Sequence, residues 1–436
     1  MYDDITELFL TNFHKVAQIG ATAAGGVHRQ AATEQDQQTR DWFANFAAAR
    51  KWPVQVDQIG NMFATVQLTD APDAKAVLVG SHLDSQPFGG RFDGAYGVVA
   101  ALHAAQAVQR AVAEDEVIAA HNLVVVNWFN EEGGRFAPSL MGSAVYAGSM
   151  ELEAMLAVED PDGTTVAQAL DTIGYRGEQD GPKDISGYAE IHIEQGRILE
   201  REGLQLGVVE SSWYTQKLAI EVLGEQSHTG ATAMADRRDA LVGASHVVLE
   251  FQEICKQFAD EALVSSVGQV SVEPNSPIVV NSRVQMTADL RANDPQIVHD
   301  ARDRLLARFA ELGQQLDLEI IANDFDIRPN RYYPLEGVEL AEKAAADLGE
   351  PVRRMQTMAG HDSVSINTVA PSVMLFIPSK DGVSHCEREF TSDQDMVAGL
   401  RWLIAVVTRL VQGELDGVTY PGSVEQYETP IVKESV

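Results

Sequence analysis

The chain has 436 residues, of which 45% are hydrophobic and 22% charged, a composition typical of a globular protein large enough for two domains. Its formal net charge of −32 disfavours binding to nucleic acid or to an anionic membrane, so we expect neither as a partner. Apolar runs are too short to span a bilayer and the first residues lack a secretion-signal pattern, so we expect a cytoplasmic protein.

The first half of the chain predicts a parallel sheet with helices packed on it. Residues 1–50 have a helical pattern, and the apolar run 76–80 is typical of a buried strand. A helical segment over 94–112 and a second apolar strand over 123–129 follow. Two buried strands joined by a helix indicate a βαβ unit, and in such sheets ligands bind beyond the carboxyl ends of the strands.

After about residue 212 the strands alternate between apolar and polar side chains instead. This alternation predicts four strands, over 217–223, 268–272, 282–291 and 317–322. Helical patterns over 240–258 and 297–312 lie between them, an order that fits an antiparallel sheet with two helices on one face.

A helix over 340–348 and an apolar strand over 372–377 then return to the first pattern. We therefore expect an α/β protein whose main domain, residues 1–212 and 330–436, has a mixed, largely parallel sheet with helices on both faces. Residues 213–329 would form an inserted α+β domain. The two cysteines, Cys255 and Cys386, make no disulfide framework.

Polar side chains with metal-binding chemistry follow the predicted strands. His82 ends the first strand, and Asp84 lies on the same face, where it could accept the other ring N–H of that histidine. Glu131 and Glu132 follow the second strand, where one could bind a cation while the other moves protons. As single residues, these have ordinary alternatives: a structural histidine and two solvated loop acids.

Three further residues extend this set. Asp93 sits in a glycine-flanked turn, where it could bridge two cations or only cap a helix. His192 and Glu194 share a strand face, and His385 follows the strand over 372–377; either histidine could instead be a satisfied core residue. Together the set offers three imidazoles and three carboxylates, enough for two divalent ions that share one bridging carboxylate.

Six motifs carry a resemblance to a known family over nearly the whole chain. They are Gly80-Ser81-His82-Leu83-Asp84-Ser85-Gln86-Pro87, Gly89-Gly90-Arg91-Phe92-Asp93-Gly94, Glu131-Glu132-Gly133, His192-Ile193-Glu194-Gln195-Gly196, Ser227-His228-Thr229-Gly230 and Gly360-His361-Asp362. They resemble the hydantoinase/carbamoylase branch of the dinuclear aminoacylase-like metallohydrolases, which contains N-carbamoyl-L-amino-acid hydrolases, β-ureidopropionases and allantoate amidohydrolases.

The resemblance implies a role for each residue of the metal set. Asp93 would bridge the two ions, His82 and His192 would complete one site, and Glu132 and His385 the other. Glu131 would be the general base. The wider superfamily usually has an acid where this chain has His192, so this histidine favours the ureido-cleaving branch over the peptidases.

The same resemblance implies a set of residues that bind the substrate. His228 would reach into a neighbouring subunit's site and stabilise the oxyanion, which implies a homodimer built on the inserted domain. Asn281 and Arg291 would hold a substrate carboxylate, and Gln195 and the backbone N–H of Gly360 would add contacts. The alternatives are a turn residue for His228, a surface ion pair for Arg291 and plain turns for Asn281 and Gly360.

The substrate expected from these features is an N-carbamoyl-L-amino acid or N-carbamoyl-β-alanine, with allantoate as an alternative. Departures from the branch at Arg197, Ala233 and Cys386 affect the expected pocket and remove no ligand. Zinc or manganese fits the ligand set, as do cobalt and nickel. Two rival readings stay open, an aminoacylase or dipeptidase with the same metals and a non-catalytic homologue that binds or scaffolds. His361 has no assigned role.

Overall fold

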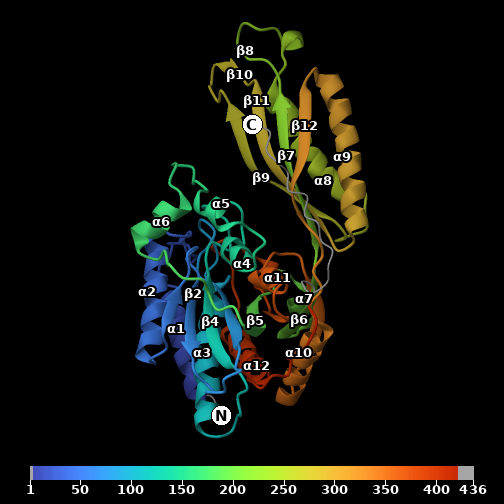
Figure 1. The fold of residues 1–436 in the computed structure, drawn as a ribbon. Coiled ribbons are helices and arrows are strands. Elements are labelled where there is room, and N and C mark those ends of the chain that lie inside the picture. Colours follow the sequence, from blue (N-terminus) through green and yellow to red (C-terminus); the bar gives the residue numbers. More distant parts are fainter. Residues whose placement is uncertain (1–2, 421–436) are drawn as a thin grey trace. The chain divides into compact units, whose positions relative to one another are not determined.

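The computed structural model describes residues 3–420, which form two compact units (Figure 1). Within this range the first unit holds residues 3–211 and 332–420, and the second holds 212–331. The sequence placed these boundaries at 213 and 329. No helix in residues 3–420 is both long and apolar enough to cross a bilayer.

The first unit contains a mixed sheet of eight strands in the order β1-β2-β4-β3-β5-β14-β6-β13. Its four central strands, β4, β3, β5 and β14, are parallel, and β2 and β6 run antiparallel to their neighbours β4 and β14. The strands are β1 (Val54–Val56), β2 (Met62–Val66), β3 (Ala76–His82), β4 (Asn122–Trp128), β5 (Ile185–Ile193), β6 (Leu206–Ser212), β13 (Val352–Thr357) and β14 (Ser372–Ile377).

Helices cover both faces of this sheet. On one face α3 and α12 pack against the central strands and α1 packs against these two helices, and on the other face α11 packs against β5 and α4. The helices of this unit are α1 (Asp3–Val16), α2 (Glu34–Ala49), α3 (Ala95–Ala113), α4 (Met141–Tyr146), α5 (Leu152–Leu156), α6 (Val166–Ile173), α7 (Ile198–Glu202), α10 (Leu335–Leu348), α11 (Asp362–Ile366), the 3-10 turn η2 (Lys380–Gly382) and α12 (Asp393–Val411).

Burial on both faces explains the continuous apolar strands in the sequence. Alternate residues of β3 enter different cores: Val77 and Val79 pack in the large core with α1, α3 and α12, while Leu78 packs in a smaller core with Ile366 of α11. An apolar residue is therefore needed at every position along the strand, and the expected parallel α/β sheet is confirmed.

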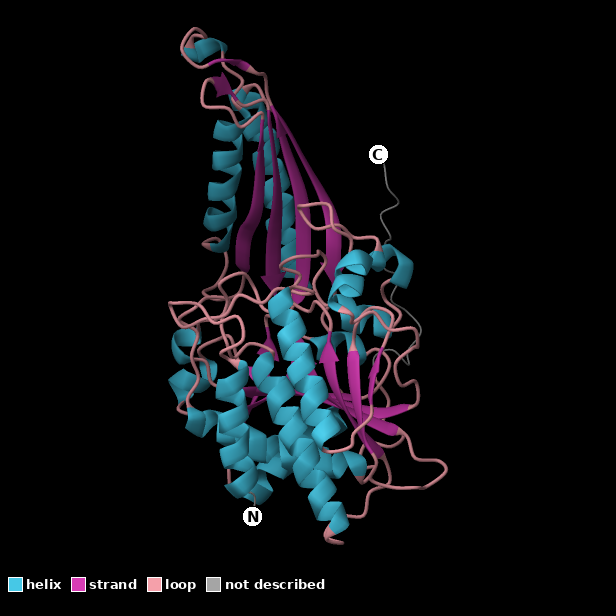
Figure 2. Ribbon diagram, turned by 90° about the vertical axis from the view of Figure 1, so that its left-hand side faces the viewer, coloured by secondary structure: helices cyan, strands magenta, loops and turns pink. Residues whose placement is uncertain are grey.

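The second unit is a four-stranded antiparallel sheet, in the order β12-β7-β11-β9, with two helices on one side (Figure 2). Leu218, Ile220 and Val222 of β7 point into a core shared with α8 and α9. Its elements are β7 (Tyr214–Leu223), β8 (Ser227–His228), the 3-10 turn η1 (Met234–Asp236), α8 (Ala240–Cys255), β9 (Val264–Glu273), β10 (Val279–Val280), β11 (Arg283–Ala292), α9 (Pro295–Leu316) and β12 (Glu319–Arg328).

Three element predictions differ from the structure in detail. The helical pattern predicted over residues 1–50 corresponds to two helices, α1 and α2, and residues 17–33 between them are not helical. The last strand of the second unit begins at Glu319, because Asp317 adopts a left-handed conformation that ends α9. Glu194 lies beyond the end of β5, so it does not share a strand face with His192 as the sequence suggested.

Candidate metal centre

The carboxyl ends of the central parallel strands meet at one end of the first unit's sheet and carry the predicted metal-binding residues (Figure 1). Residues far apart in the sequence therefore converge here. They are His82 and His192 in β3 and β5, Asp93 just before α3, Glu131 and Glu132 in the loop after β4, and His385 in the loop after β14.

The first group at this end consists of His82, His192 and Asp93, all buried. Oδ1 of Asp93 lies 3.0 Å from Nε2 of His192 and 3.4 Å from Nε2 of His82. The two imidazole rings are near-parallel with centroids 5.9 Å apart. Two ring nitrogens and a carboxylate oxygen thus point at a common position.

The second group uses the other oxygen of the same carboxylate. Oδ2 of Asp93 lies 3.4 Å from Nε2 of His385, and that nitrogen lies 3.3 Å from Oε2 of Glu132. Asp93 therefore belongs to both groups, with one oxygen in each. This is the arrangement that a carboxylate bridging two cations requires.

Hydrogen bonds fix which nitrogen of each buried ring faces the groups. Nδ1 of His82 lies 3.0 Å from the backbone oxygen of Asp84, and Nδ1 of His192 lies 2.9 Å from the backbone oxygen of Ile193. A carbonyl only accepts, so each Nδ1 carries a proton, and in the neutral ring each Nε2 is left as an acceptor. Nε2 of His192 accepts the backbone N–H of Gly94 at 3.0 Å. Nε2 of His82 is buried and has no hydrogen-bond partner.

The carboxylate of Asp84 does not play the role expected from the sequence. The ring of His82 is oriented by the backbone oxygen of Asp84, and the carboxylate lies farther away, at 3.6 Å. That carboxylate instead accepts the backbone N–H groups of Glu131 and Glu132, at 3.2 and 3.3 Å. One residue thus orients a histidine and the two glutamates of the next strand's loop.

Opposite charges control ionisation at this site. Burial acts to raise the pKa of Asp93, but contacts with the three histidines outweigh burial and hold the pKa well below its ordinary value. Burial opposes charging of His82, yet the carboxylates around it raise its pKa well above the usual range. The centre therefore favours charge pairs of opposite sign over neutral forms.

Glu131 differs from Asp93 in its ionisation. Its Oε2 lies 3.4 Å from Nε2 of His82. Burial raises its pKa well above the ordinary value, and the neighbouring charges of Asp362 and Glu132 raise it further. A buried carboxyl group with a raised pKa is a candidate for proton transfer in catalysis.

The two groups fit divalent cations by their chemistry. Imidazole nitrogen and carboxylate oxygen are ligands for zinc, manganese, cobalt and nickel. A buried ring nitrogen that has a lone pair and no hydrogen-bond donor, as in His82, is matched by a cation. The sequence-predicted ligand set is thus brought together by the fold, in two groups joined through Asp93.

Gln195 and Gly360 lie in the same unit as these groups. Nε2 of Gln195 donates to Oδ2 of Asp93 at 2.7 Å, so this side chain reaches the centre itself. Gly360 directly precedes His361, whose ring centroid lies 4.6 Å from that of His192. Nε2 of His361 contacts the hydroxyl of Thr357 at 3.1 Å.

The remaining predicted residues lie in the second unit. His228 pairs with Val279 across β8 and β10, and its Nδ1 accepts the backbone N–H groups of Gly230 and Ala231, at 3.0 and 3.1 Å. The side-chain oxygen of Asn281 accepts the backbone N–H of Asn275.

Arg291 makes an ion pair inside the second unit, with Nη2 2.7 Å from Oδ2 of Asp289. An ion pair was the alternative that the sequence left open for Arg291, and the substrate-binding role of this residue stays a prediction.

The sequence did not identify Ser384 and Glu389 as parts of the site. The hydroxyl of Ser384 lies 2.9 Å from Oδ2 of Asp93, and Oε1 of Glu389 accepts the backbone N–H of Asp93 at 3.1 Å. The only signal was their position beside His385. A serine and a glutamate in a polar loop have no distinctive pattern.

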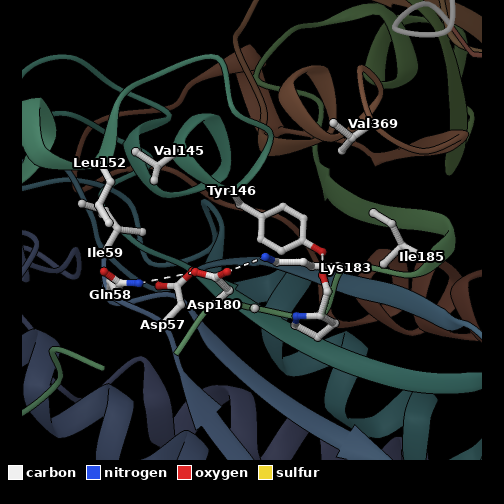
Figure 3. Close-up of a pocket in the computed structure, with 12 residues that line it drawn as sticks. Asp57, Gln58, Ile59, Val145, Tyr146, Leu152, Asp180, Lys183, Ile185 and Val369 are labelled. Carbon is white, nitrogen blue, oxygen red and sulfur yellow. Dashed lines mark hydrogen bonds and ion pairs between the residues drawn. The ribbon is translucent and has the colours of Figure 1, made fainter. Parts of the chain in front are cut away.

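A separate cavity of about 380 Å³ lies in the first unit, lined by side chains around Tyr146 (Figure 3). Burial raises the pKa of Asp57 in this cavity to about 7, and its two oxygens each accept a bond of 2.8 Å from Asn61. Asp180 forms an ion pair with Lys183. These polar groups are engaged with one another, so we assign the cavity no catalytic role.

Comparisons with known proteins agree with this geometry. Residues 78–409 match peptidase family M20/M25/M40. A putative hydrolase from Mycolicibacterium smegmatis is 46% identical over 413 residues, 94% of each chain. An N-carbamoyl-L-amino-acid amidohydrolase from Rhizobium meliloti is 36% identical over 88% of this chain and 91% of its own. The crystal structure of an amidase of the hydantoinase/carbamoylase family from Burkholderia vietnamiensis covers 92% of this chain and 96% of its own, with 36% identity and a TM-score of 0.86.

Proposed function

Because this chain belongs to peptidase family M20/M25/M40 and is a metal-dependent hydrolase of carbon–nitrogen bonds other than peptide bonds, we propose that it cleaves the ureido bond of a small N-carbamoyl compound. The substrate is an N-carbamoyl-L-amino acid or N-carbamoyl-β-alanine. The products are the free amino acid, ammonia and carbon dioxide.

One observation carries this proposal. The two oxygens of Asp93 lie in two different groups of metal-binding atoms, with His82 and His192 on one side and Glu132 and His385 on the other. In this proposal Asp93 and these four residues would hold two divalent cations, zinc or manganese. A histidine at position 192, in place of the acid usual in the wider superfamily, favours a ureido substrate over a peptide.

The chain's own residues supply the proton transfers. When bound, the two cations polarise the ureido carbonyl and make an attacking water more acidic. Glu131 takes the proton from that water and delivers it to the leaving nitrogen, a role that suits its raised pKa. Asp84 holds the backbone of Glu131 in place for both steps.

The substrate carboxylate is held by Arg291 and Asn281 in this scheme. A guanidinium forms two parallel bonds with a carboxylate, and Arg291 already binds the carboxylate of Asp289. The substrate carboxylate would join or replace Asp289 there. Gln195 contacts the ureido or carboxylate end, and the backbone N–H of Gly360 adds a donor.

His228 stabilises the negative charge that develops on the ureido oxygen. Two backbone N–H groups donate to its Nδ1, so Nε2 carries the proton and is the nitrogen that can donate to an oxyanion. A neutral histidine oriented in this way suits the role without any change of protonation.

We further propose that the enzyme is a homodimer formed through the second unit, in which His228 acts in the partner's site. Strand β9 is the last strand of its sheet, and an exposed edge strand can pair with another chain. Four large apolar side chains of α8 are exposed, and such a patch is typical of an interface. They are Leu241, Val242, Val248 and Leu249.

We also propose a cytoplasmic location. Both cysteines are free, as is usual for a cytoplasmic protein.

Ammonia release tests the proposed reaction. The protein is stripped with a chelator, reloaded with manganese or zinc, and offered N-carbamoyl-L-amino acids, N-carbamoyl-β-alanine, allantoate, N-acetyl amino acids and dipeptides. We expect metal-dependent ammonia from an N-carbamoyl amino acid or from N-carbamoyl-β-alanine. Ammonia from allantoate alone would make allantoate the substrate in place of an N-carbamoyl amino acid. Free amine from an acyl compound or dipeptide without ammonia would refute the ureido assignment.

A further inference from the structure

Glu389 is a buried carboxylate that the proposed reaction does not use. It lies in the loop after β14, close in sequence to His385, and is 4% exposed. Its Oε1 accepts the backbone N–H groups of Phe92 and Asp93, at 3.0 and 3.1 Å. It thus binds the main chain on which the bridging carboxylate is carried.

The loop before Asp93 is shaped to this carboxylate. A Cβ added to Gly90 would lie 1.9 Å from the carboxyl carbon of Glu389, so any side chain at position 90 would displace it. Gly94, on the other side of Asp93, is similarly constrained, since a Cβ there would lie 2.3 Å from the ring of His82. The backbone around Asp93 is therefore held between Glu389 and a metal-binding histidine.

A shared hydroxyl connects Glu389 to the side chain of Asp93 as well. Oγ of Ser384 lies 2.7 Å from Oε2 of Glu389 and 2.9 Å from Oδ2 of Asp93. A hydroxyl has one proton, so Ser384 can donate fully to only one of the two carboxylates. A bond from Ser384 to Glu389 removes one of the two donors on Oδ2, which also accepts from Nε2 of Gln195 at 2.7 Å.

We propose that Glu389 is a positioning residue that holds Asp93 between the two ligand groups, an inference that rests on the proposed dinuclear site. It acts through the main chain of the loop by two backbone bonds and through the side chain by Ser384. Because Asp93 contributes to both groups, loss of Glu389 weakens both ion-binding steps.

Binding of Co²⁺ to the full-length, metal-stripped protein tests this role without reference to turnover. Affinity is measured by competition with a coloured chelator, and geometry by the visible absorption spectrum of the bound ions. We expect Glu389→Ala to weaken both steps by about 10- to 100-fold and to alter the spectrum, as is typical when groups that orient ligands are removed. Glu389→Gln keeps an oxygen that can accept the two backbone bonds, so we expect a smaller loss, below about 10-fold.

Asp57→Asn is the matched control. Asp57 is also a buried carboxylate of the first unit that accepts a backbone N–H, but it belongs to the separate cavity and contacts none of the ligands. We expect this variant to bind Co²⁺ as the wild type does, with the same spectrum.

The outcomes separate the two proposals. If the wild-type protein fails to bind two ions, the proposed dinuclear site is wrong. If the wild type binds two ions and Glu389→Ala binds them with unchanged affinity and spectrum, the positioning role is wrong. If the binding of only one ion is weakened, the effect lies in the His385 loop and not in Asp93, and the positioning role is wrong. Should the alanine variant not fold, as judged by circular dichroism, Glu389→Asp takes its place, because the shorter side chain draws the carboxylate away from the two backbone N–H groups. Unchanged affinity and spectrum in Glu389→Asp is then the refuting result.

Discussion

Asp57 should make the free energy of unfolding of the first unit depend on pH, and the substitution Asp57→Asn should remove this contribution. Burial raises its pKa from 3.8 to about 7. The folded state therefore binds the proton more tightly than the unfolded state. The cost of burying the charge is absent below the unfolded pKa and grows as pH rises through about 7.

The magnitude follows from the two pKa values. Between pH 6 and pH 8 the unfolded carboxyl group is ionised throughout, while the folded one loses its proton. A folded pKa of about 7 then lowers the free energy of unfolding by about 1.4 kcal/mol over this interval. Asp84, with a pKa of about 6, and Glu389, with one of about 7, add their own pH dependence to both proteins. The difference between wild type and Asp57→Asn isolates Asp57.

Urea unfolding followed by tryptophan fluorescence is a suitable assay, because four of the five tryptophans lie in the first unit. We expect the wild type to lose about 1.4 kcal/mol more than Asp57→Asn between pH 6 and pH 8. The exposed Asp70→Asn variant should follow the wild type. Equal losses in wild type and Asp57→Asn would show that burial does not hold the proton on Asp57 and would refute the reasoning.

Four further predictions concern the proposed site. Glu131→Gln should lower kcat by about 10²- to 10⁴-fold while the metal content, measured by elemental analysis, stays that of the wild type; a variant with full ammonia release would remove Glu131 from the mechanism. His228→Asn should lower kcat by about 10²- to 10³-fold with unchanged metal content; unchanged turnover would leave it a turn residue. Arg291→Lys should raise KM more than it lowers kcat, because a single ammonium cannot form the two parallel bonds to a carboxylate; an unchanged KM would make the pair with Asp289 its whole role. Chelation should lower the temperature of thermal unfolding, and added manganese should restore it, because the ions bind the folded state; equal curves with and without chelator would argue against a folded metal site.

The central strands could be predicted from the sequence because burial on both faces of the sheet requires mainly apolar residues in them. Strand β14 occupies residues 372–377, as predicted, since every position in it is buried between two layers. Strands β1, β2, β6 and β13 were not predicted. Of these, β1 and β13 lie at the two edges of the eight-stranded sheet, where side chains are only partly buried and the apolar signal is weak. Strand order was also beyond reach, because it depends on which distant segments pair.

In the candidate metal centre, too, some features could be predicted from the sequence and others could not. Each histidine or acidic residue alone has ordinary alternatives, but their recurrence at several strand ends suggested a metal centre, so His82, Asp93 and His192 could be picked out as members of a set. The contacts that orient these side chains could not be predicted. The ring of His82 is fixed by a backbone oxygen, which no side-chain pattern encodes, and Glu194, assigned to a shared strand face, instead accepts backbone N–H bonds from Ile198 and Leu199 of α7.

Glu389 shows why such contacts escape sequence reasoning and why they matter for function. It is 296 positions from Asp93 along the chain, and a glutamate in a polar loop is ordinarily a solvated charge. Only the fold reveals that this carboxylate is buried against Gly90 and accepts two backbone bonds from the loop that carries Asp93, the proposed bridging ligand. A carboxylate that must serve two ions needs both oxygens fixed in space, which its own backbone torsions cannot ensure. The glycines that let the chain approach, and the remote glutamate that occupies the space they leave, together supply that constraint.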